Sequence, residues 1–334
     1  ARDIPWVVAD MTEDLLTSLS PLTERINETM KGILIEDSSI LGEVSMYNFM
    51  GGGKRLRPLI FCLCHSALGG EIDEEILRLS TTFEFLHMAS LLHDDIVDQA
   101  DTRRGRPAAH HIFGIPETIM AADYLLAKAS LLALTKKNFD VAEIMAEVIK
   151  DLSLGELWEL KAKNNVELDK GEYIEIIMHK TAHLIEGVSW SAAALNGAPN
   201  DQLMSLRYYG RLTGLSFQIK DDILDYQADP DKLGKPVGQD LEEGRITLPF
   251  ILARENLTGD ELARLLTLGS LVAPTAEEKT EAVALVDKAG GIEAAQKQAE
   301  ALAELAASSL ANIPESQARQ DLERLTEYTV NRNR

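Results

Sequence analysis

The 334-residue sequence predicts an all-α protein, and three observations point to that fold class. Hydrophobic residues make up 45% of the chain, which is enough for a sizeable core. Long amphipathic patterns run through it, with Ala, Leu and Glu plentiful and few runs of β-branched residues. Glycine and proline turn signals divide the chain into segments of helical length. No linker-like tract interrupts them, so residues 1–334 are expected to form a single domain.

The turn signals place the predicted helices in order, because each helix is expected to lie between two of them. The signals fall at residues 51–58, 69–70, 105–107, 114–116, 164–165, 197–199, 229–230 and 234–236. From residue 259 onward the chain is rich in Ala, Glu and Leu, with breaks at Pro274, 290–291 and Pro314. This last part is expected to form several packed helices with solvated outer faces.

Charge and composition exclude several classes of partner. The chain has 33 basic and 54 acidic residues, a net charge of −21, whereas a nucleic-acid partner requires a positive surface. No stretch approaches the ~20 uninterrupted apolar residues of a membrane span, and no signal-peptide pattern opens the chain. A cytoplasmic protein without an integral membrane segment is expected. The cysteines, Cys62 and Cys64, are two apart and should be buried apolar residues on a helix.

The pattern Asp-Asp-x-x-Asp occurs twice, and each copy interrupts an apolar, helix-compatible run. On a helix, the first and last carboxylates of the pattern lie about one turn apart on one face. Clustered carboxylates raise each other's pKa unless a cation lies among them, and carboxylate oxygens suit Mg²⁺. A solvated acidic face is the alternative, but the apolar flanks argue against it. Two such helices facing each other would clamp a magnesium diphosphate. The carboxylates are Asp94, Asp95, Asp98, Asp221, Asp222 and Asp225.

A glycine-rich basic segment, GGGKRLRP, begins at Gly51. Its glycines allow a backbone to approach an anion closely, and Lys54, Arg55 and Arg57 follow as charged donors. The spacing is not that of a Walker loop. A basic surface loop is the alternative interpretation. A further arginine pair, 103–104, follows the first acidic cluster, which favours phosphate binding.

Helical phase, at roughly 100° per residue, relates other polar residues to the two clusters. His87 and Ser90 share a stripe with Asp94 and Asp98, although a lone His is more often a core residue. Gln218 shares a face with the second cluster. Lys220 points the other way, so it is expected at the surface.

Six motifs, read in order, resemble those of the trans-isoprenyl diphosphate synthases, the polyprenyl synthetase family. They are GGGKRLRP, LHMASLLHDDIVD, DTRRG, HKTAHL, FQIKDDILD and GKPVGQDLEEGRITLP. The resemblance extends to GGIEAA and the terminal LTEYTVNR, so it covers nearly the whole chain. Each motif is modestly specific, whereas all of them in order are highly specific.

The resemblance implies a helical bundle around a deep central cavity, usually a homodimer. The implied reaction joins isopentenyl diphosphate head-to-tail to an allylic diphosphate and releases pyrophosphate, with several Mg²⁺ ions. Asp94, Asp98 and Asp221 would hold Mg²⁺ on the allylic diphosphate, supported by Asp95, Asp222 and Asp225. That diphosphate would also contact Arg103, Lys180 and Lys235. Isopentenyl diphosphate would bind to Lys54, Arg57, His87 and Arg104. Thr181 and Gln218 would line the gap where the allylic cation forms.

Product length is expected to depend on the residues one helical turn before Asp94, where the growing chain descends in this family. These are Ala89 and Ser90, both small, and the acidic motif carries no two-residue insertion. A medium- or long-chain all-trans product is therefore predicted. A short-chain product, farnesyl or geranylgeranyl diphosphate, is the alternative, and it would require a floor deeper in the tunnel.

Three other classes compete with this interpretation. A class I terpene cyclase also carries an Asp-rich helix, but its second metal motif differs and it lacks the glycine-rich basic loop. A metal-dependent phosphohydrolase would suit the doublet His93-Asp94 but needs further histidine ligands, and the remaining histidines show no such spacing. A non-catalytic partner subunit should have lost part of one acidic cluster, and both are intact.

Overall fold

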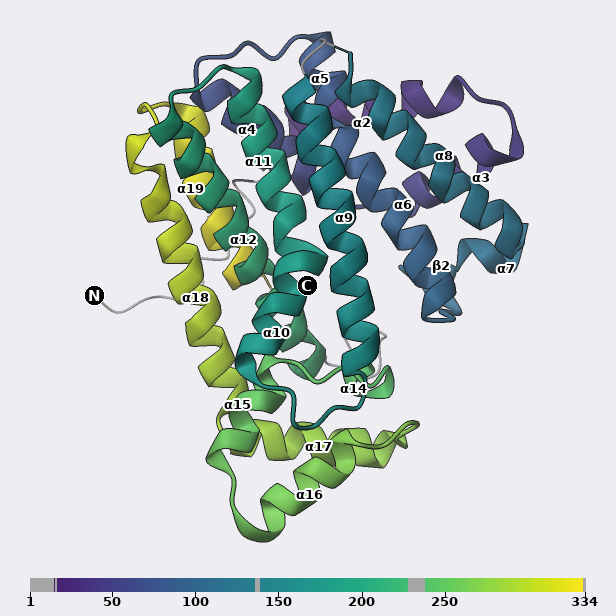
Figure 1. The fold of residues 1–334 in the computed structure, drawn as a ribbon, viewed down its shortest axis with the longest axis vertical. Helices are drawn as coiled ribbons and strands as arrows, with labels where there is room; N and C mark the ends of the chain where they lie inside the picture. The colour runs from purple at the N-terminus through teal and green to yellow at the C-terminus, as the bar shows by residue number, and fades with distance from the viewer. Residues whose placement is uncertain (1–14, 16, 136–138, 228–237, 333–334) are drawn as a thin grey trace. The chain divides into compact units, whose positions relative to one another are not determined.

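The structure is a computed structural model that describes residues 15, 17–135, 139–227 and 238–332. Within these ranges every regular element is a helix except for one short two-stranded hairpin (Figure 1). The predicted all-α class is therefore confirmed. The chain divides into two compact units, each described here by itself. The single domain predicted for residues 1–334 stays a prediction.

The first unit comprises residues 1–149, 187–207 and 312–322. In Figure 1, α8 runs alongside α6, and the hairpin and α7 lie beyond the end of α6 that carries the first acidic cluster. Its elements are α2 (Ser20–Ile35), α3 (Ile40–Met50), α4 (Leu56–Ala67), α5 (Glu74–Ser80), α6 (Thr82–Val97), β1 (Thr102–Arg103), β2 (Arg106–Pro107), α7 (Ala109–Phe113) and α8 (Ile115–Ala133).

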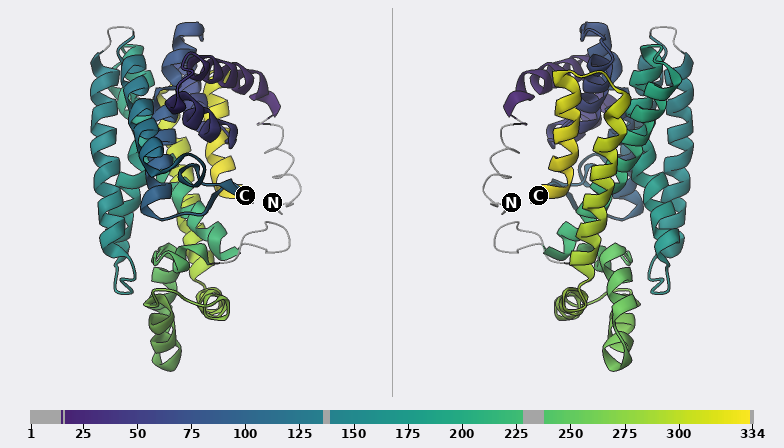
Figure 2. Two further views of the ribbon diagram at one scale, coloured as in Figure 1. Left: turned by 90° about the vertical axis from the view of Figure 1, so that its right-hand side faces the viewer. Right: turned by 90° about the vertical axis from the view of Figure 1, so that its left-hand side faces the viewer.

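The second unit comprises residues 150–186, 208–311 and 323–334. Figure 2 shows α17 almost end-on beside α16, so these two helices cross. Its complete elements are α10 (Lys170–Ile177), a π-helical turn η1 (Met178–Ala182), α14 (Gln239–Glu242), α15 (Leu248–Asn256), α16 (Gly259–Gly269), α17 (Ala276–Lys288) and α18 (Gly291–Ser309). Five elements contribute residues to both units: α9 (Phe139–Ala162), α11 (His183–Leu195), α12 (Asn200–Gln227), the 3₁₀ turn η2 (Leu310–Asn312) and α19 (Gln317–Asn331).

The hairpin after α6 follows from its turn residues. Thr102 pairs with Pro107 and Arg103 with Arg106, leaving Arg104 and Gly105 as a two-residue loop. Both loop residues have positive φ, 52° and 73°. Two positive φ angles in a row are the geometry of a type I′ turn, which matches the twist of antiparallel strands. The turn therefore presents the two adjacent arginines close to the end of α6.

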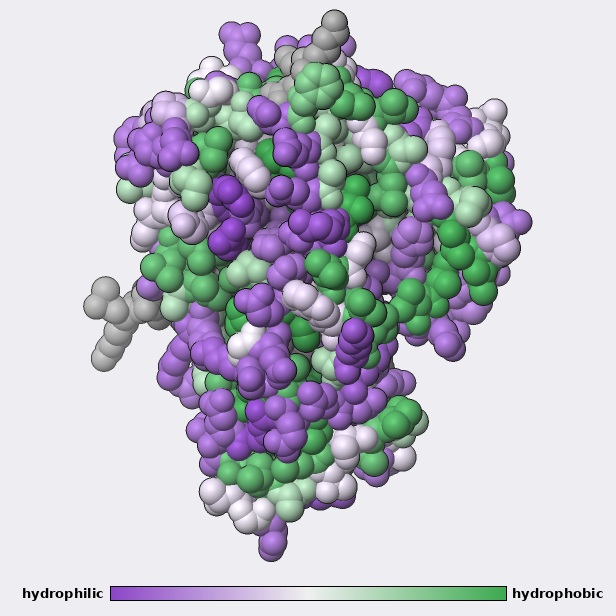
Figure 3. Space-filling model, viewed as in Figure 1, coloured by the Kyte–Doolittle hydropathy of each residue, from purple (hydrophilic) through white to green (hydrophobic). Residues whose placement is uncertain are grey.

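The first unit holds both cysteines in its interior and several large apolar side chains at its surface. Cys62 and Cys64 are buried and free, as predicted. Large exposed apolar side chains gather over α7 and α8, visible as green atoms at the right of Figure 3. They are Ile112, Ile115, Met120 and Leu131. Among the helices that the structure describes, none is long and apolar enough to cross a membrane.

Candidate active site

The first acidic cluster lies at the C-terminal end of α6. Asp98 caps the helix, and its backbone N–H donates to the carbonyl of Asp94 at 2.8 Å. Asp94 and Asp98 are half-buried and one turn apart, as the spacing predicts. Asp95, between them, is only 3% exposed. The cluster therefore offers two partly accessible carboxylates and one that faces the protein interior.

Asp95 and Arg103 form a short ion pair that connects α6 to the hairpin. Burial raises the pKa of Asp95, and the charge and hydrogen bond of Arg103 oppose that shift. An arginine beside a buried carboxylate compensates the cost of removing its charge from water. Arg103 is predicted to contact the allylic diphosphate. In this structure it is paired instead with Asp95, one of the carboxylates predicted to support the metal ligands.

The glycine-rich segment meets the second arginine of the hairpin. Gly52 and Gly53 have positive φ, and Arg104 donates from Nη1 to the carbonyl of Gly52. A Cβ added at Gly53 would lie 3.1 Å from that guanidinium, so the glycine keeps the loop and arginine close. Lys54 is exposed. Two predicted phosphate-binding elements are thus brought together within the first unit.

Arg55 has a different role from its neighbours in the segment. It is 5% exposed and lies 3.3 Å from Glu84, which is also buried. It also donates to Asn27 and to the carbonyl of Phe49, at 2.9 and 3.0 Å. Arg57 lies 3.6 Å from the same glutamate. Arg55 therefore anchors the segment to the protein, and Arg57 is left closer to solvent.

His87 lies among arginines, as its stripe on α6 predicts for a phosphate-binding position. Burial lowers the pKa of His87 well below its usual range, and the charges of nearby arginines lower it further. The ring is therefore neutral at physiological pH. The arginines are Arg57, Arg104, Arg103 and Arg55. Such a concentration of positive charge stands out in a chain with a net charge of −21.

A small pocket in the first unit joins these elements. Asp95 lines it together with three arginines of the hairpin, Arg103, Arg104 and Arg106. Its lining therefore combines one carboxylate with three guanidinium groups. This arrangement suits a ligand that carries phosphate groups.

The second acidic cluster lies near the C-terminal end of α12, and each carboxylate has a different partner. Asp221 is paired with Arg332 at 2.8 Å. Asp222 is buried and accepts hydrogen bonds from Tyr173 at 2.6 Å and Gln218 at 2.8 Å. The two oxygens of Asp225 accept from successive backbone N–H groups at the start of α14, each at 3.0 Å. The protein therefore orients all three carboxylates.

A chain of hydrogen bonds connects the cluster to the π-helical turn. Thr181 donates to Gln218 at 2.7 Å, and Gln218 donates to Asp222. Burial raises the pKa of Asp222 to about 7. Thr181 and Gln218, predicted to line the reaction gap together, are in direct contact.

Lys180 lies on the same π-helical turn and contacts two glutamates of α9. It is 2.8 Å from Glu156 and also pairs with Glu159. These charges raise its pKa, although burial acts in the opposite direction. Arg245 shares Glu159, at 3.3 Å. Lys180 is therefore cationic and fixed in position.

Two glycines let neighbouring helices approach this turn closely. A Cβ on Gly155 of α9 would lie 2.4 Å from the backbone nitrogen of Lys180. A Cβ on Gly214 of α12 would lie 2.6 Å from the Cα of Ala182. Both contacts are with backbone atoms, which cannot move aside as a side chain does. The turn that carries Lys180 and Thr181 is therefore held from two sides.

We expect Gly155→Ala and Gly214→Ala each to destabilise the protein by about 1–3 kcal/mol, because the added methyl group overpacks the contact. Displacement of Lys180 and Thr181 should also lower kcat. Urea unfolding and steady-state kinetics measure the two effects. The matched control is Gly32→Ala on α2, where a Cβ meets no atom within 4 Å. That substitution should stabilise the helix, and equal losses at all three positions would contradict the close-approach argument.

The structure corrects one predicted position and adds a charged residue that was not predicted. The surface position predicted for Lys220 is wrong, because it is 7% exposed and donates to Gln296 at 2.9 Å. The face of α12 that carries Lys220 is covered by other residues as well. Pointing away from the acidic face therefore does not make a residue exposed. Lys235 lies outside the described residues. Arg332, the partner of Asp221, was missed, although the terminal TVNR motif marks its position.

The predicted length-determining residues lie within α6. Ala89 is fully buried, and Ser90 donates from its hydroxyl to the carbonyl of His87 at 3.0 Å. Neither places a large side chain one turn before Asp94. Their influence on product length stays a prediction.

Two Asp-rich helical segments and an arginine-lined pocket in an all-α fold are the features expected of a helical enzyme that binds diphosphates. The chain belongs to the polyprenyl synthetase family, since the polyprenyl synthetase family model matches residues 38–286. It is 34% identical over 313 residues to an octaprenyl diphosphate synthase of Haemophilus influenzae, covering 94% of each chain.

Solved structures agree with this assignment. The chain is similar, with a TM-score of 0.88 and 31% identity, to a polyprenyl synthase from Caulobacter crescentus in complex with calcium and isoprenyl diphosphate, covering 97% of this chain and 98% of that one. A geranylgeranyl pyrophosphate synthetase from Pyrococcus horikoshii matches with the same TM-score and identity, over 96% and 99% of the chains. A decaprenyl diphosphate synthase from Rhodobacter capsulatus also has a TM-score of 0.88 and 31% identity, over 97% and 99% of the chains, so similarity of fold does not separate these two product lengths.

Proposed function

We propose that this chain is an Mg²⁺-dependent prenyltransferase that extends an allylic diphosphate with isopentenyl diphosphate units, head-to-tail. The product is a medium- or long-chain all-trans polyprenyl diphosphate, and pyrophosphate is released. The observation that carries the proposal is the convergence of the glycine-rich loop, the hairpin arginines and His87 beside an acidic cluster in an otherwise strongly acidic chain. Full-length similarity to a polyprenyl diphosphate synthase supports it.

The donor set of both clusters fits divalent metal ions. All six side chains are carboxylates, which suit Mg²⁺, and burial raises the pKa values of Asp95, Asp222 and Asp225. A bound cation would favour the ionised forms of these groups. When bound, Mg²⁺ supplies positive charge that stabilises the leaving diphosphate. Asp94, Asp98 and Asp221 are the proposed ligands, supported by Asp95, Asp222 and Asp225.

Cationic side chains, together with the neutral ring of His87, orient the two diphosphates in this proposal. Isopentenyl diphosphate binds to Lys54, Arg57, His87 and Arg104, whereas the allylic diphosphate binds to Arg103, Lys180 and Lys235. Preorganised positive groups stabilise the charge that develops as the allylic carbon–oxygen bond breaks. The hydroxyl of Thr181 and the amide of Gln218, fixed by their hydrogen bond, face the allylic cation. Apolar walls exclude water from that cation.

Small residues at 89 and 90 support a product longer than farnesyl or geranylgeranyl diphosphate. A bulky side chain one turn before Asp94 would block the growing chain, and Ala89 and Ser90 supply none. The similarity to an octaprenyl diphosphate synthase points in the same direction.

A product assay tests the function directly. Purified protein, Mg²⁺, radiolabelled isopentenyl diphosphate and farnesyl diphosphate are incubated, and the dephosphorylated products are sized by chromatography. We expect a ladder that ends well beyond geranylgeranyl. Products that stop at farnesyl or geranylgeranyl would keep the chemistry but contradict the proposed length. No incorporation with any allylic primer would overturn the synthase assignment.

We propose in addition a cytoplasmic homodimer. The exposed apolar side chains over α7 and α8 support a partner on that face of the first unit. Light scattering during size-exclusion chromatography measures the mass in solution. A mass of one chain at micromolar concentration would contradict the dimer.

Asp222 predicts a pH dependence of stability in the metal-free protein. Its pKa is about 7 in the folded protein and about 4 in the unfolded chain. Between these values the folded state binds the extra proton, so stability falls as pH rises. We expect the free energy of unfolding to fall by roughly 1 kcal/mol between pH 6.5 and 8 as Asp222 loses its proton in the folded protein.

Urea unfolding in the presence of EDTA measures this slope, and added Mg²⁺ should reduce it. Asp222→Asn is the matched variant, because the amide does not titrate. An unchanged slope in that variant would assign the pH dependence to other groups.

A further inference from the structure

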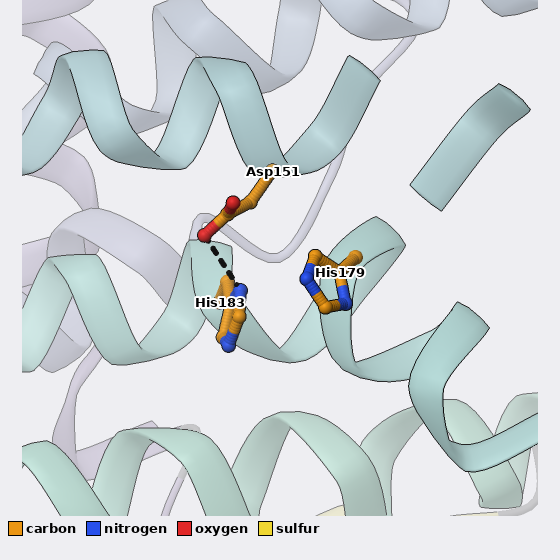
Figure 4. A group of neighbouring side chains, drawn as sticks. All are labelled: Asp151, His179 and His183. Carbon is orange, nitrogen blue, oxygen red and sulfur yellow. Dashed lines mark ion pairs between the residues drawn. The ribbon is translucent and has the colours of Figure 1, made fainter. Parts of the chain in front are cut away.

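A second group of metal-binding side chains lies outside the proposed active-site residues, within the second unit. Asp151 of α9, His179 of the π-helical turn and His183 at the start of α11 point toward one another (Figure 4). One ligand atom from each lies within 4.8 Å of the others. The three side chains are 17–20% exposed, so they are largely buried but still reachable from solvent.

The backbone fixes which nitrogen of His179 is available. Its Nδ1 lies 3.0 Å from the carbonyl oxygen of Glu175. A carbonyl only accepts hydrogen bonds, so Nδ1 carries the proton and Nε2 keeps its lone pair. This is the usual orientation of a metal-binding histidine, whose second nitrogen donates to a backbone carbonyl or carboxylate. The edge contact with Trp158, at 4.6 Å, also restrains the ring.

His183 directs its Nδ1 atom, rather than Nε2, at Asp151. Its Nδ1 lies 2.9 Å from Oδ2 of Asp151, yet this buried atom forms no hydrogen bond with any described residue. Ligands at about 2.0–2.2 Å from a tetrahedral metal ion lie roughly 3.3–3.6 Å apart, so the two side chains need to separate by only about 0.5 Å to share an ion. On the opposite side, Nε2 lies 3.9 Å from Glu186, which Arg211 holds through two hydrogen bonds of 2.8 Å. That separation is too long for a hydrogen bond, so Glu186 contributes a negative charge beside the ring rather than a fixed orientation.

The π-helical turn contributes to the geometry. It spans Met178–Ala182, so His179 and His183 are four residues apart on a locally widened helix. Their rings are 4.8 Å apart at 61° to each other, which leaves the nitrogens free to converge with Asp151. Single π-helical turns are found often at functional sites.

We propose that Asp151, His179 and His183 form a binding site for a divalent transition-metal ion, with Zn²⁺ as the best-fitting ion. Two imidazoles and one carboxylate suit zinc, whereas Mg²⁺ prefers oxygen ligands alone. Three protein ligands leave the remaining position to water. The ion ties α9 to the π-helical turn that carries Lys180 and Thr181. The site shares no residue with the proposed Mg²⁺ clusters and does not depend on the proposed synthase reaction.

Metal binding by the untagged full-length chain tests the proposal. The protein is stripped with a chelator and titrated with Zn²⁺ against a chromogenic competitor, with excess Mg²⁺ to saturate the all-carboxylate clusters. We expect one Zn²⁺ per chain. His183→Ala and Asp151→Asn should each weaken binding at least about 100-fold. His111→Ala, an exposed histidine of α7 outside the cluster, should bind as the wild type does.

Thermal unfolding guards against variants that fail to fold. Zn²⁺ should raise the Tm of the wild type and of the His111 variant, but not that of folded Asp151→Asn. Bound Co²⁺ should show the visible absorption of a nitrogen-coordinated site, lost in His179→Ala. Equal Zn²⁺ affinity in the wild type and all three cluster variants would overturn the proposal. Loss of Zn²⁺ on adding Mg²⁺ would also overturn it, even with a fully active synthase.

Discussion

Asp94→Asn should lower kcat by about 10²- to 10³-fold, the loss expected when one electrostatic contact to a developing charge is removed. The amide keeps the shape of the side chain but removes the negative charge that a bound cation requires. Asp94 is half-buried at the end of α6. The concentration of Mg²⁺ needed for half-maximal activity should rise as well.

Steady-state kinetics over a Mg²⁺ series measures both effects. Asp140→Asn, an exposed carboxylate in the first turn of α9, is the control and should leave kcat unchanged. A variant at residue 94 with wild-type kcat at low Mg²⁺ would remove this residue from the proposed metal site.

Arg55→Ala should cost about 3–5 kcal/mol of stability, because it leaves the buried carboxylate of Glu84 without its nearest cation. The substitution also removes hydrogen bonds to Asn27 and the carbonyl of Phe49. The glycine-rich loop loses its anchor, so the protein should unfold at much lower urea concentration.

The adjacent Lys54→Ala is the matched comparison. Lys54 is exposed, and its loss should change stability by no more than about 0.5 kcal/mol. We expect it instead to raise the KM for isopentenyl diphosphate by about 10- to 100-fold, the worth of one charge-assisted hydrogen bond. Equal unfolding midpoints for the two variants would contradict the assignment of Arg55 as an anchor.

The elements and the motif positions could be predicted from sequence because they depend on local pattern. The acidic spacing places Asp94 and Asp98 one turn apart on α6, and the turn signal at 105–107 falls at the loop of the hairpin, although its two short strands were not predicted. These features involve residues only a few positions apart. Helical periodicity and turn chemistry therefore suffice to find them.

Pairings between distant segments could not be predicted in the same way. Arg332 meets Asp221, and Tyr173 meets Asp222, across long separations that no spacing rule covers. The error at Lys220 has a similar cause, since helical phase gives a direction but not what covers it. The π-helical turn likewise depends on packing against Gly155 and Gly214, a close approach that single-sequence reasoning does not reveal.

Three cations that are proposed to bind diphosphates already have partners within the protein. Arg103 is engaged by Asp95, Arg104 by the carbonyl of Gly52, and Lys180 by two glutamates. In the proposed reaction, substrate entry is therefore an exchange of partners, in which a diphosphate takes the place of a protein oxygen. The net gain per contact is then smaller than the number of cations suggests. A diphosphate with bound metal ions brings positive charge that can neutralise the carboxylates it displaces. An anion without metal ions brings none, so the site should discriminate against it.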